Sequence, residues 1–199
     1  NYDMVILTNL YPEHLEAHGG FENYKKAKLK IFEYASMYGY GRKQGRNIGF
    51  QKMEKECCDE MTKTAIVNGN SEYCEEFLGS GFFDRQIVFE REDQKGHHPN
   101  LSPISYLLSA KDISATKNGL TFTVGERQFN PRLFGEHNVL NILAAMSVLR
   151  ALDVSWSVIE KAVNELKSPP GRIEFIPDAE KRGFKVIVDR NKKKFIFAF

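Results

Sequence analysis

The sequence predicts an α/β domain, in which strands and helices alternate along the chain. Residues 2–7 form an apolar run rich in branched side chains, which is typical of a buried strand. A helix is predicted at residues 21–35, because apolar side chains recur there at helical spacing after the Gly19-Gly20 break. Strand-like and helix-like segments continue to alternate after that helix, which is the pattern of an α/β fold.

The later elements are predicted by the same local signals. Strand candidates are short apolar runs bounded by turn residues, and they are residues 64–67, 87–90, 104–110, 120–124, 128–133 and 184–189. Lys117-Asn118-Gly119 predicts a hairpin turn between two of these strands. Further helices are expected at residues 54–61, 71–78 and 138–152. The last of these is apolar on most sides, so we expect it to be buried.

Composition limits the class of protein. The 199 residues are 42% hydrophobic and 27% charged, which allows one well-formed core and a tail. The balance of 28 basic and 26 acidic residues, a net charge of +2, argues against nucleic acid as the main partner. No apolar run is long enough to span a membrane and no signal peptide is evident, so a cytoplasmic location is expected. Cys57, Cys58 and Cys74 are odd in number and lack C-x-x-C spacing, which favours reduced thiols over a disulfide or zinc site.

Two side chains near the first predicted strand could carry chemistry. Lys28 lies in the middle of the apolar side of its helix, flanked by Tyr24, Ile31 and Phe32 at positions i−4, i+3 and i+4. An unpaired ammonium on a buried face is costly, so Lys28 should snorkel to solvent, form an ion pair or be modified. His14 lies in the loop after the strand, where ligands bind in open α/β sheets, and such a histidine is either a surface residue or a metal ligand.

Residues 8–19 read Thr-Asn-Leu-Tyr-Pro-Glu-His-Leu-Glu-Ala-His-Gly, and Glu22, Tyr24, Ala27 and Lys28 follow them. This segment resembles the central domain of the Mur ligases, in particular the branch that adds the third amino acid to UDP-MurNAc-dipeptide. The family pattern there is T-N-L-x-x-[DE]-H-L-[DE]-x-H-G, and then E-x-Y-x-x-A-K. The resemblance implies that Lys28 is carbamylated and binds Mg2+ together with His14, and that Thr8 and Asn9 bind substrate.

A second motif lies at residues 135–145, Gly-Glu-His-Asn-Val-Leu-Asn-Ile-Leu-Ala-Ala, and it resembles the family pattern G-x-[HF]-N-x-x-N-x-L-A-A. Asn138 and Asn141 are three residues apart, so they share one face near the beginning of the predicted helix. Amide side chains at that place can cap the helix or hydrogen-bond a flat heterocycle. The resemblance implies that this pair contacts the adenine of ATP.

The third motif is Pro-Pro-Gly-Arg-Ile-Glu at residues 169–174, which resembles the segment P-x-G-R-x-E of the family. The resemblance implies that Arg172 binds ATP. The guanidinium group can do so because its fixed geometry lets it donate two hydrogen bonds to phosphate oxygens. The strand at residues 184–189 resembles the family's linker strand, which implies that Asp189 binds the nucleotide. The family continues with Tyr-Ala-His, whereas this chain has a basic run at residues 190–194, which we expect to be a solvated end.

The resemblance also indicates what this chain lacks. Mur ligases hold the phosphates of ATP with a G-T-N-G-K-[ST] loop, and no such loop occurs in the printed sequence. We therefore expect a partial central domain at residues 1–175, with a mostly parallel sheet flanked by helices and a small antiparallel portion. A linker strand and the start of a divergent carboxy-terminal part are expected at residues 176–199. Residues 36–62 look like an insertion.

The intact enzyme implied by the resemblance is an ATP-dependent ligase of peptidoglycan precursor synthesis. It would join an amino acid to UDP-MurNAc-dipeptide through an acyl phosphate, with Mg2+, as a monomer without a nucleic-acid or membrane partner. Without the phosphate loop, this fragment should bind ATP weakly and be inactive alone. Two alternatives remain: a non-catalytic relic or interaction module that keeps the fold, and a ligase like the folylpolyglutamate synthetases, which the H-L-[DE]-x-H-G form disfavours.

Overall fold

The computed structural model describes residues 2–12, 15–43, 62–98, 105–116, 118–169, 174–175, 185–189 and 194–198. The chain divides into two compact units. The first comprises Asn1–Ala110 and Leu140–Val154, and the second comprises Lys111–Val139 and Ser155–Phe199. The expected boundary at residue 175 stays a prediction.

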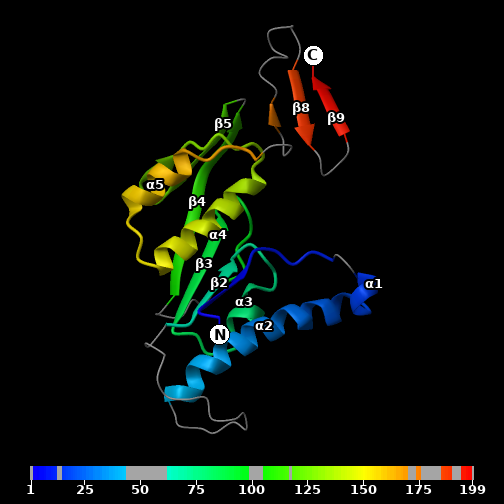
Figure 1. Ribbon diagram of the computed structural model, residues 1–199, viewed down its shortest axis with the longest axis vertical. Helices are drawn as coiled ribbons and strands as arrows, with labels where there is room; N and C mark the ends of the chain where they lie inside the picture. Colours follow the sequence, from blue (N-terminus) through cyan, green and yellow to red (C-terminus); the bar gives the residue numbers. More distant parts are fainter. Residues whose placement is uncertain are drawn as a thin grey trace. The chain divides into compact units, whose positions relative to one another are not determined.

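The first unit is built on parallel strands. In order, β1 (Met4–Leu7), β2 (Thr64–Asn68), β3 (Arg85–Arg91) and β4 (Ser105–Thr116) pair as parallel neighbours, and β2, β3 and β4 are seen in Figure 1. The complete strand order of this sheet is β1-β2-β3-β4-β5-β6, in which the last two strands form an antiparallel hairpin. The α/β class and the mostly parallel sheet with a small antiparallel portion are therefore confirmed.

One face of β1 is covered and the other is more open. Val5 and Leu7 are buried, whereas Ile6 on the other face is 41% exposed. The expectation of a strand that is buried throughout is therefore wrong. The physical reason is position, because β1 is the first strand in the order and has β2 as its one neighbour among the described strands.

Two helices cover the face of the sheet that carries Val5 and Leu7. They are α2 (Phe21–Lys43) and α3 (Cys74–Leu78), and their apolar side chains join one cluster with β1 and β2. The rings of Phe32 on α2 and Phe77 on α3 meet edge to face at 5.0 Å, and burying such a side chain stabilises the fold by roughly 2 kcal/mol. The helix α2 continues well past residue 35, and a short helix α1 (Leu15–His18) precedes it where a loop was expected.

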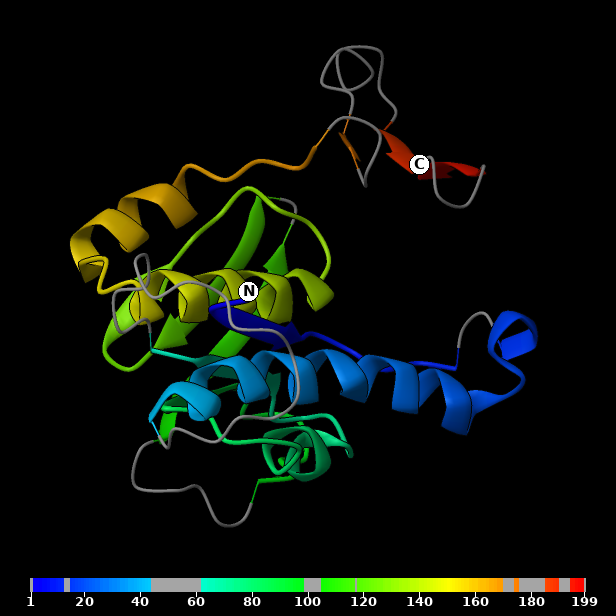
Figure 2. The same ribbon diagram turned by 60° about the horizontal axis from the view of Figure 1, so that its bottom comes forward.

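The helix α4 (His137–Ala151) is buried as expected, through Val139, Ile142, Leu143 and Met146. In Figure 2 it lies on the opposite side of β1 from α2. None of the helices in the described part of the chain combines the length and the apolar character that a membrane span needs.

In the second unit, β5 (Gly119–Val124) and β6 (Arg127–Phe129) form the antiparallel hairpin, and the rings of Phe122 and Phe129 stack across it at 5.3 Å. The predicted turn before β5 is present, with Thr116 Oγ1 accepting from Asn118 N at 3.1 Å. The helix α5 (Trp156–Asn164) was not predicted. It is held to β6 by Arg127, whose Nε lies 2.7 Å from Glu160 and whose guanidinium lies over the Trp156 ring.

A separate antiparallel sheet lies near the end of the chain. Its strands are β7 (Glu174–Phe175), β8 (Lys185–Asp189) and β9 (Lys194–Ala198), in that order. The strand β8 was predicted, but β9 was not. Lys194 pairs with Asp189 in the ladder, residues 190–193 lie outside the described residues, and the solvated end expected at residues 190–194 stays a prediction.

Candidate ligand site at the ends of the parallel strands

The carboxyl ends of β1 and β2 open into a pocket of about 530 Å³, which we call the strand-end pocket. Ligands in open α/β sheets bind at this kind of edge. The pocket is lined by polar side chains from three loops and by aromatic rings, and its lining residues are Asn9, Leu10, Tyr11, Pro12, Phe21, Asn68, Asn70, Ser71, Glu72, Tyr73, Gln94, His97 and Leu140. Its polar groups are mostly neutral amides and hydroxyls, which both donate and accept hydrogen bonds.

Asn68, the last residue of β2, connects the first two loops of this pocket. It is 3% exposed. Its Nδ2 donates to the carbonyl oxygen of Thr8 at 2.9 Å and to Oδ1 of Asn9 at 3.3 Å. Its Oδ1 accepts from the backbone N–H of Asn70 at 3.0 Å. The side chain therefore uses both ends of its amide to hold the ends of β1 and β2 together.

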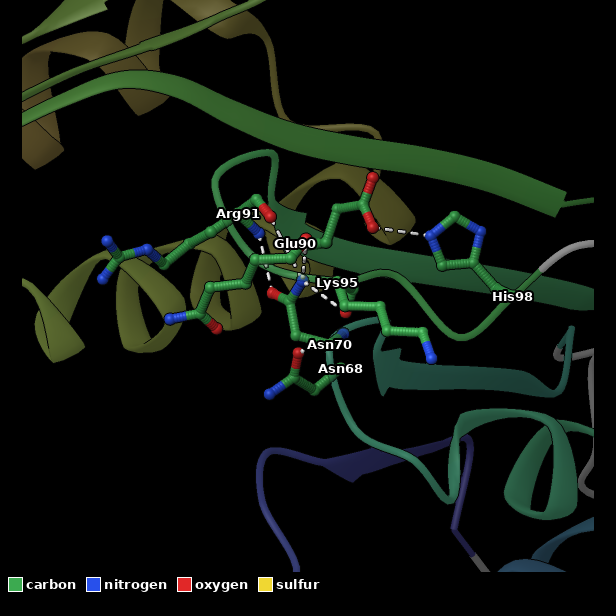
Figure 3. A network of polar contacts seen from close by, with 7 residues as sticks. Asn68, Asn70, Glu90, Arg91, Lys95 and His98 are labelled. Carbon is green, nitrogen blue, oxygen red and sulfur yellow. Dashed lines mark hydrogen bonds and ion pairs between the residues drawn. The ribbon is translucent and has the colours of Figure 1, made fainter.

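Asn70 connects the second loop with the third, as Figure 3 shows. Its Oδ1 accepts from the backbone N–H of Arg91 at 2.8 Å, and its Nδ2 lies within hydrogen-bond distance of the carbonyl oxygens of Arg91, Gln94 and Lys95. A carboxylate at this position could accept but could not donate. The amide of Asn70 does both, so it can bind donors and acceptors of this backbone segment.

An ion pair lies in the third loop, between Arg91 at the end of β3 and Asp93. The Arg91 guanidinium, whose side chain is almost fully buried, donates to both carboxylate oxygens of Asp93, at 2.9 and 2.6 Å. This bidentate contact holds the pKa of Asp93 below its usual range.

Lys25 on α2 contacts Tyr73, one of the aromatic residues that line the strand-end pocket. Its Nζ lies 3.1 Å from Glu76, 3.3 Å from Glu22 and 5.1 Å from the centre of the Tyr73 ring. The hydrogen bond to Glu76 is the largest cause that raises the pKa of Lys25. Burial, and secondarily the hydrogen bond to Glu72, raises the pKa of Tyr73.

A second, more acidic hollow of about 720 Å³ lies beside the first and shares three of its residues, Glu72, Gln94 and His97. Glu75, Glu90, Glu92 and His98 also line it. Nε2 of His98 lies 2.6 Å from Oε2 of Glu90, so this pair attaches the segment after β3 to the strand itself.

Lys28 does not lie where its helical spacing placed it. It is exposed, it lines a third hollow of about 260 Å³ along β1, and its Nζ lies 5.5 Å from the centre of the Tyr24 ring. The expected burial of Lys28 is wrong, because α2 turns its covered side, with Phe32 and Ala35, onto the core and leaves Lys28 beside the edge of β1. Among the lysines of α2 whose burial is described, Lys25 is the partly buried one, with a side chain 15% exposed.

The other predicted site residues are divided between described and undescribed parts. Thr8 and Asn9 are exposed and line hollows at the end of β1. Asn138 donates from Nδ2 to the carbonyl oxygen of Phe134 at 2.8 Å, so part of its amide serves the start of α4, and Asn141 is exposed one turn later. His14 and Arg172 lie outside the described residues, and for Asp189 the backbone position at the end of β8 is described.

The described residues hold no preformed cluster of metal-binding side chains. No group of three or more His, Cys, Asp or Glu side chains comes together among the described residues in a way that could hold a metal ion. An unmodified lysine cannot ligate Mg2+ as an oxygen donor, so Lys28 could contribute only as a carbamate. The expected pairing of Lys28 with His14 stays a prediction.

The sequence did not predict several polar residues of the strand-end pocket as site residues, among them Asn68, Asn70, Gln94 and His97. A signal for the first two existed, because they follow a buried strand whose end must lie beside that of β1 in a parallel sheet. Gln94 and His97 lie in a polar segment with no periodicity. Only the fold brings that segment back to the end of β2, where His97 N donates to Gly69 O at 2.8 Å.

The sequence model of the family described as Mur ligase middle domain matches residues 1–149. Among curated proteins, the chain is 28% identical over 184 residues to the UDP-N-acetylmuramoyl-L-alanyl-D-glutamate--2,6-diaminopimelate ligase of Pseudomonas putida, covering 90% of this chain and 32% of that protein. The corresponding ligase of Pseudomonas syringae pv. tomato is 25% identical over 181 residues, covering 90% and 31%. The chain thus spans about one third of the length of these relatives.

Solved structures show the same fold at lower identity. A crystal structure of MurF from Acinetobacter baumannii superposes with a TM-score of 0.58 at 19% identity, covering 87% of this chain and 31% of that one. A pseudomurein peptide ligase type C from Methanothermus fervidus gives 0.59 at 16% identity, covering 95% and 38%.

Proposed function

Because the chain belongs to the Mur ligase middle-domain family, we propose that it is the central part of an ATP-dependent ligase that adds an amino acid to UDP-N-acetylmuramoyl-dipeptide. The curated relatives carry the names of such ligases. The observation that carries the proposal is the strand-end pocket, because Asn9 of the first family motif lines it just after the end of β1. That is the edge of an α/β sheet at which substrates bind.

In this proposal Thr8 and Asn9 contact the UDP-N-acetylmuramoyl-dipeptide. Asn138 and Asn141 contact adenine from the first turns of α4, since each amide can donate and accept. Arg172 and Asp189 bind the rest of the nucleotide, with the arginine fork directed to phosphate oxygens. These assignments rest on the motif matches.

The proposed reaction has two steps, phosphoryl transfer and then amide formation. A carboxylate oxygen of the substrate attacks the terminal phosphorus of ATP, which gives an acyl phosphate and ADP. The incoming amine then attacks the acyl carbon, inorganic phosphate leaves, and the amine releases a proton as the amide forms. Arg172 would stabilise the charge on the transferring phosphoryl group.

The proposal gives His14 and a carbamylated Lys28 the role of holding Mg2+, which would offset phosphate charge when bound. Carbamylation requires the neutral Lys28 amine to add to carbon dioxide and lose a proton. The exposure of Lys28 leaves it accessible to carbon dioxide.

Because the reaction consumes ATP, we place the protein in the cytoplasm. We also expect it to be a monomer.

Titration of the isotope-labelled 199-residue chain with UDP-N-acetylmuramoyl-L-alanyl-D-glutamate tests the acceptor site. Backbone amide signals of residues 8–11 and 68–73 should shift in a saturable way, and Asn9→Ala should weaken that binding. The matched control is Asn118→Ala, an exposed asparagine in the turn before β5. The absence of saturable shifts in the wild-type chain at several millimolar ligand would overturn the proposal.

The nucleotide site is tested by calorimetry and phosphate release. Without a phosphate loop in the sequence, ATP should bind in the millimolar range, about −4 kcal/mol. We expect no phosphate release by this chain alone with Mg2+, ATP, UDP-N-acetylmuramoyl-dipeptide and either diaminopimelate or lysine. Turnover that disappears in Lys28→Ala would show an active enzyme, and it would contradict the expected inactivity while supporting the site. Micromolar ATP binding would reveal another phosphate site.

A further inference from the structure

The amide of Asn68 has an orientation that backbone atoms alone determine. One end accepts from the backbone N–H of Asn70, so that end is the oxygen, and the other end donates to the carbonyl oxygen of Thr8, so that end is the nitrogen. In Figure 3 the nitrogen of Asn68 lies on the side away from Asn70. Neither backbone partner can exchange its role, so the amide cannot turn over without losing both bonds.

The fixed amide of Asn68 in turn orients Asn9. The Asn68 nitrogen that donates to Thr8 also lies 3.3 Å from the side chain of Asn9. Only the oxygen of Asn9 can accept there, because two amide nitrogens would face each other otherwise. The Nδ2 group of Asn9, with its two N–H donors, is therefore on the other end of an exposed side chain that lines the strand-end pocket.

Asn70, whose backbone N–H orients the amide of Asn68, is itself held in place. Asn70 presents its backbone N–H to Asn68 while its side chain is bonded to the backbone of Arg91, Gln94 and Lys95. The turn after β2 therefore cannot shift without breaking contacts to the end of β3. Networks of this kind stiffen a site, since each member fixes the next.

We propose that Asn68 is a positioning residue that acts through Asn9: it directs the Asn9 N–H donors toward an oxygen acceptor of the UDP-N-acetylmuramoyl-dipeptide. The proposal rests on the proposed function, and it adds a residue and a chemical preference to it. Asn68 acts through Asn9 because both ends of its own amide are already hydrogen-bonded within the protein. The site would discriminate in favour of ligand groups that accept hydrogen bonds at this point.

The decisive variant is Asn68→Asp, which keeps the acceptor for Asn70 N–H and removes the donor to Thr8 and Asn9. The Asn9 amide should then reverse, so that its nitrogen faces the new carboxylate and its oxygen faces the ligand. We expect the dissociation constant for UDP-N-acetylmuramoyl-L-alanyl-D-glutamate, measured by titration of labelled protein, to rise about tenfold. Asn118→Asp, which adds the same charge in an exposed turn, should leave it unchanged.

A double-mutant cycle separates positioning from a general structural role. In an Asn9→Ala background, Asn68→Asp should weaken binding by less than about twofold, because the group through which it acts is gone. Asn9→Asp, which replaces the outward donors by an acceptor and leaves Asn68 intact, should weaken binding at least as much as Asn68→Asp. Because Asn9 is exposed, Asn9→Asp should fold, and it can test the proposal even if Asn68→Asp does not fold.

The outcomes distinguish this inference from the proposed function. Equal weakening by Asn68→Asp in both backgrounds, or wild-type affinity in Asn9→Asp, overturns the positioning role and leaves the proposed function standing. No binding by the wild-type chain overturns both. A tenfold loss that appears only when Asn9 is present supports the relay from Asn70 through Asn68 to Asn9.

Discussion

His98 and Glu90 form a short contact in which Nε2 lies 2.6 Å from Oε2, with 15% and 12% of the two side chains exposed. Two glycines leave room for it. A Cβ atom at Gly69 would lie 2.8 Å from the His98 ring, and one at Gly96 would lie 2.9 Å from the Glu90 carboxylate. The pair fastens the segment that carries Gln94 and His97 into the strand-end pocket.

Replacement of Glu90 by alanine should therefore lower stability. The change leaves the enclosed His98 ring without its carboxylate partner, and we expect a loss of about 1–3 kcal/mol in the free energy of unfolding. Urea denaturation gives the measurement. Glu92→Ala removes an exposed carboxylate two residues away and is the matched control. Equal stability of the two variants would contradict the role of the pair.

Gly119→Ala should be strongly destabilising. Gly119 begins β5 with a φ of +127°, and a Cβ atom there would lie 2.3 Å from the carbonyl oxygen of Pro131. Backbone strain and this overlap should together lower the free energy of unfolding by about 3 kcal/mol. Gly125→Ala is the control, since its φ is +60° and no atom lies within 4 Å of the added carbon. That change should lower the free energy by about 1 kcal/mol. A larger loss at Gly125 than at Gly119 in thermal or urea denaturation would be inconsistent with this packing.

The buried thiol of Cys74 should make stability depend on alkaline pH. Burial raises its pKa from 9.0 to about 12. Between these two values the unfolded chain loses the thiol proton more readily than the folded chain, so the free energy of unfolding falls as pH rises. Below 9.0 the effect is absent. The stability difference between wild type and Cys74→Ala, measured by urea denaturation, should therefore shrink above this pH. A constant difference across the range would contradict the burial of the thiol.

Carbamylation of Lys28 gives a direct test of the metal assignment. Lys28 lies on the same helix as Lys26 and Lys30, and all three are exposed. In bicarbonate enriched in carbon-13, we expect a carbamate signal in the carbon spectrum that disappears in Lys28→Ala and persists in Lys26→Ala and Lys30→Ala. Addition of Mg2+ should increase it, since a bound ion stabilises the carboxylate form. A signal that survives Lys28→Ala would remove the lysine from the proposed site.

Local patterns in the sequence determined those elements that are continuous apolar runs or that alternate between buried and more open positions. The buried strand β2, the alternating strand β5 and the long helix α4 lie within about two residues of their predicted bounds. The short elements α5 and β9 were missed. In α5 two residues, Ile159 and Val163, are buried, and a pattern of two is too weak to separate a helix from a polar loop.

For the site, the sequence by itself determined that Thr8, Asn9 and the Asn68-Gly69-Asn70 turn follow strands, and so could meet at one edge of a parallel sheet. The tertiary structure alone decided how atoms face each other there. It showed that Asn68 and Asn70 use both ends of their amides to bind three loops, and that on α2 Lys25 is partly buried whereas Lys28 is exposed. The physical reason is that a periodic stripe specifies the direction of a side chain along its own helix or strand. Burial and hydrogen-bond partners depend on which other elements cover that direction, and these come from distant parts of the chain.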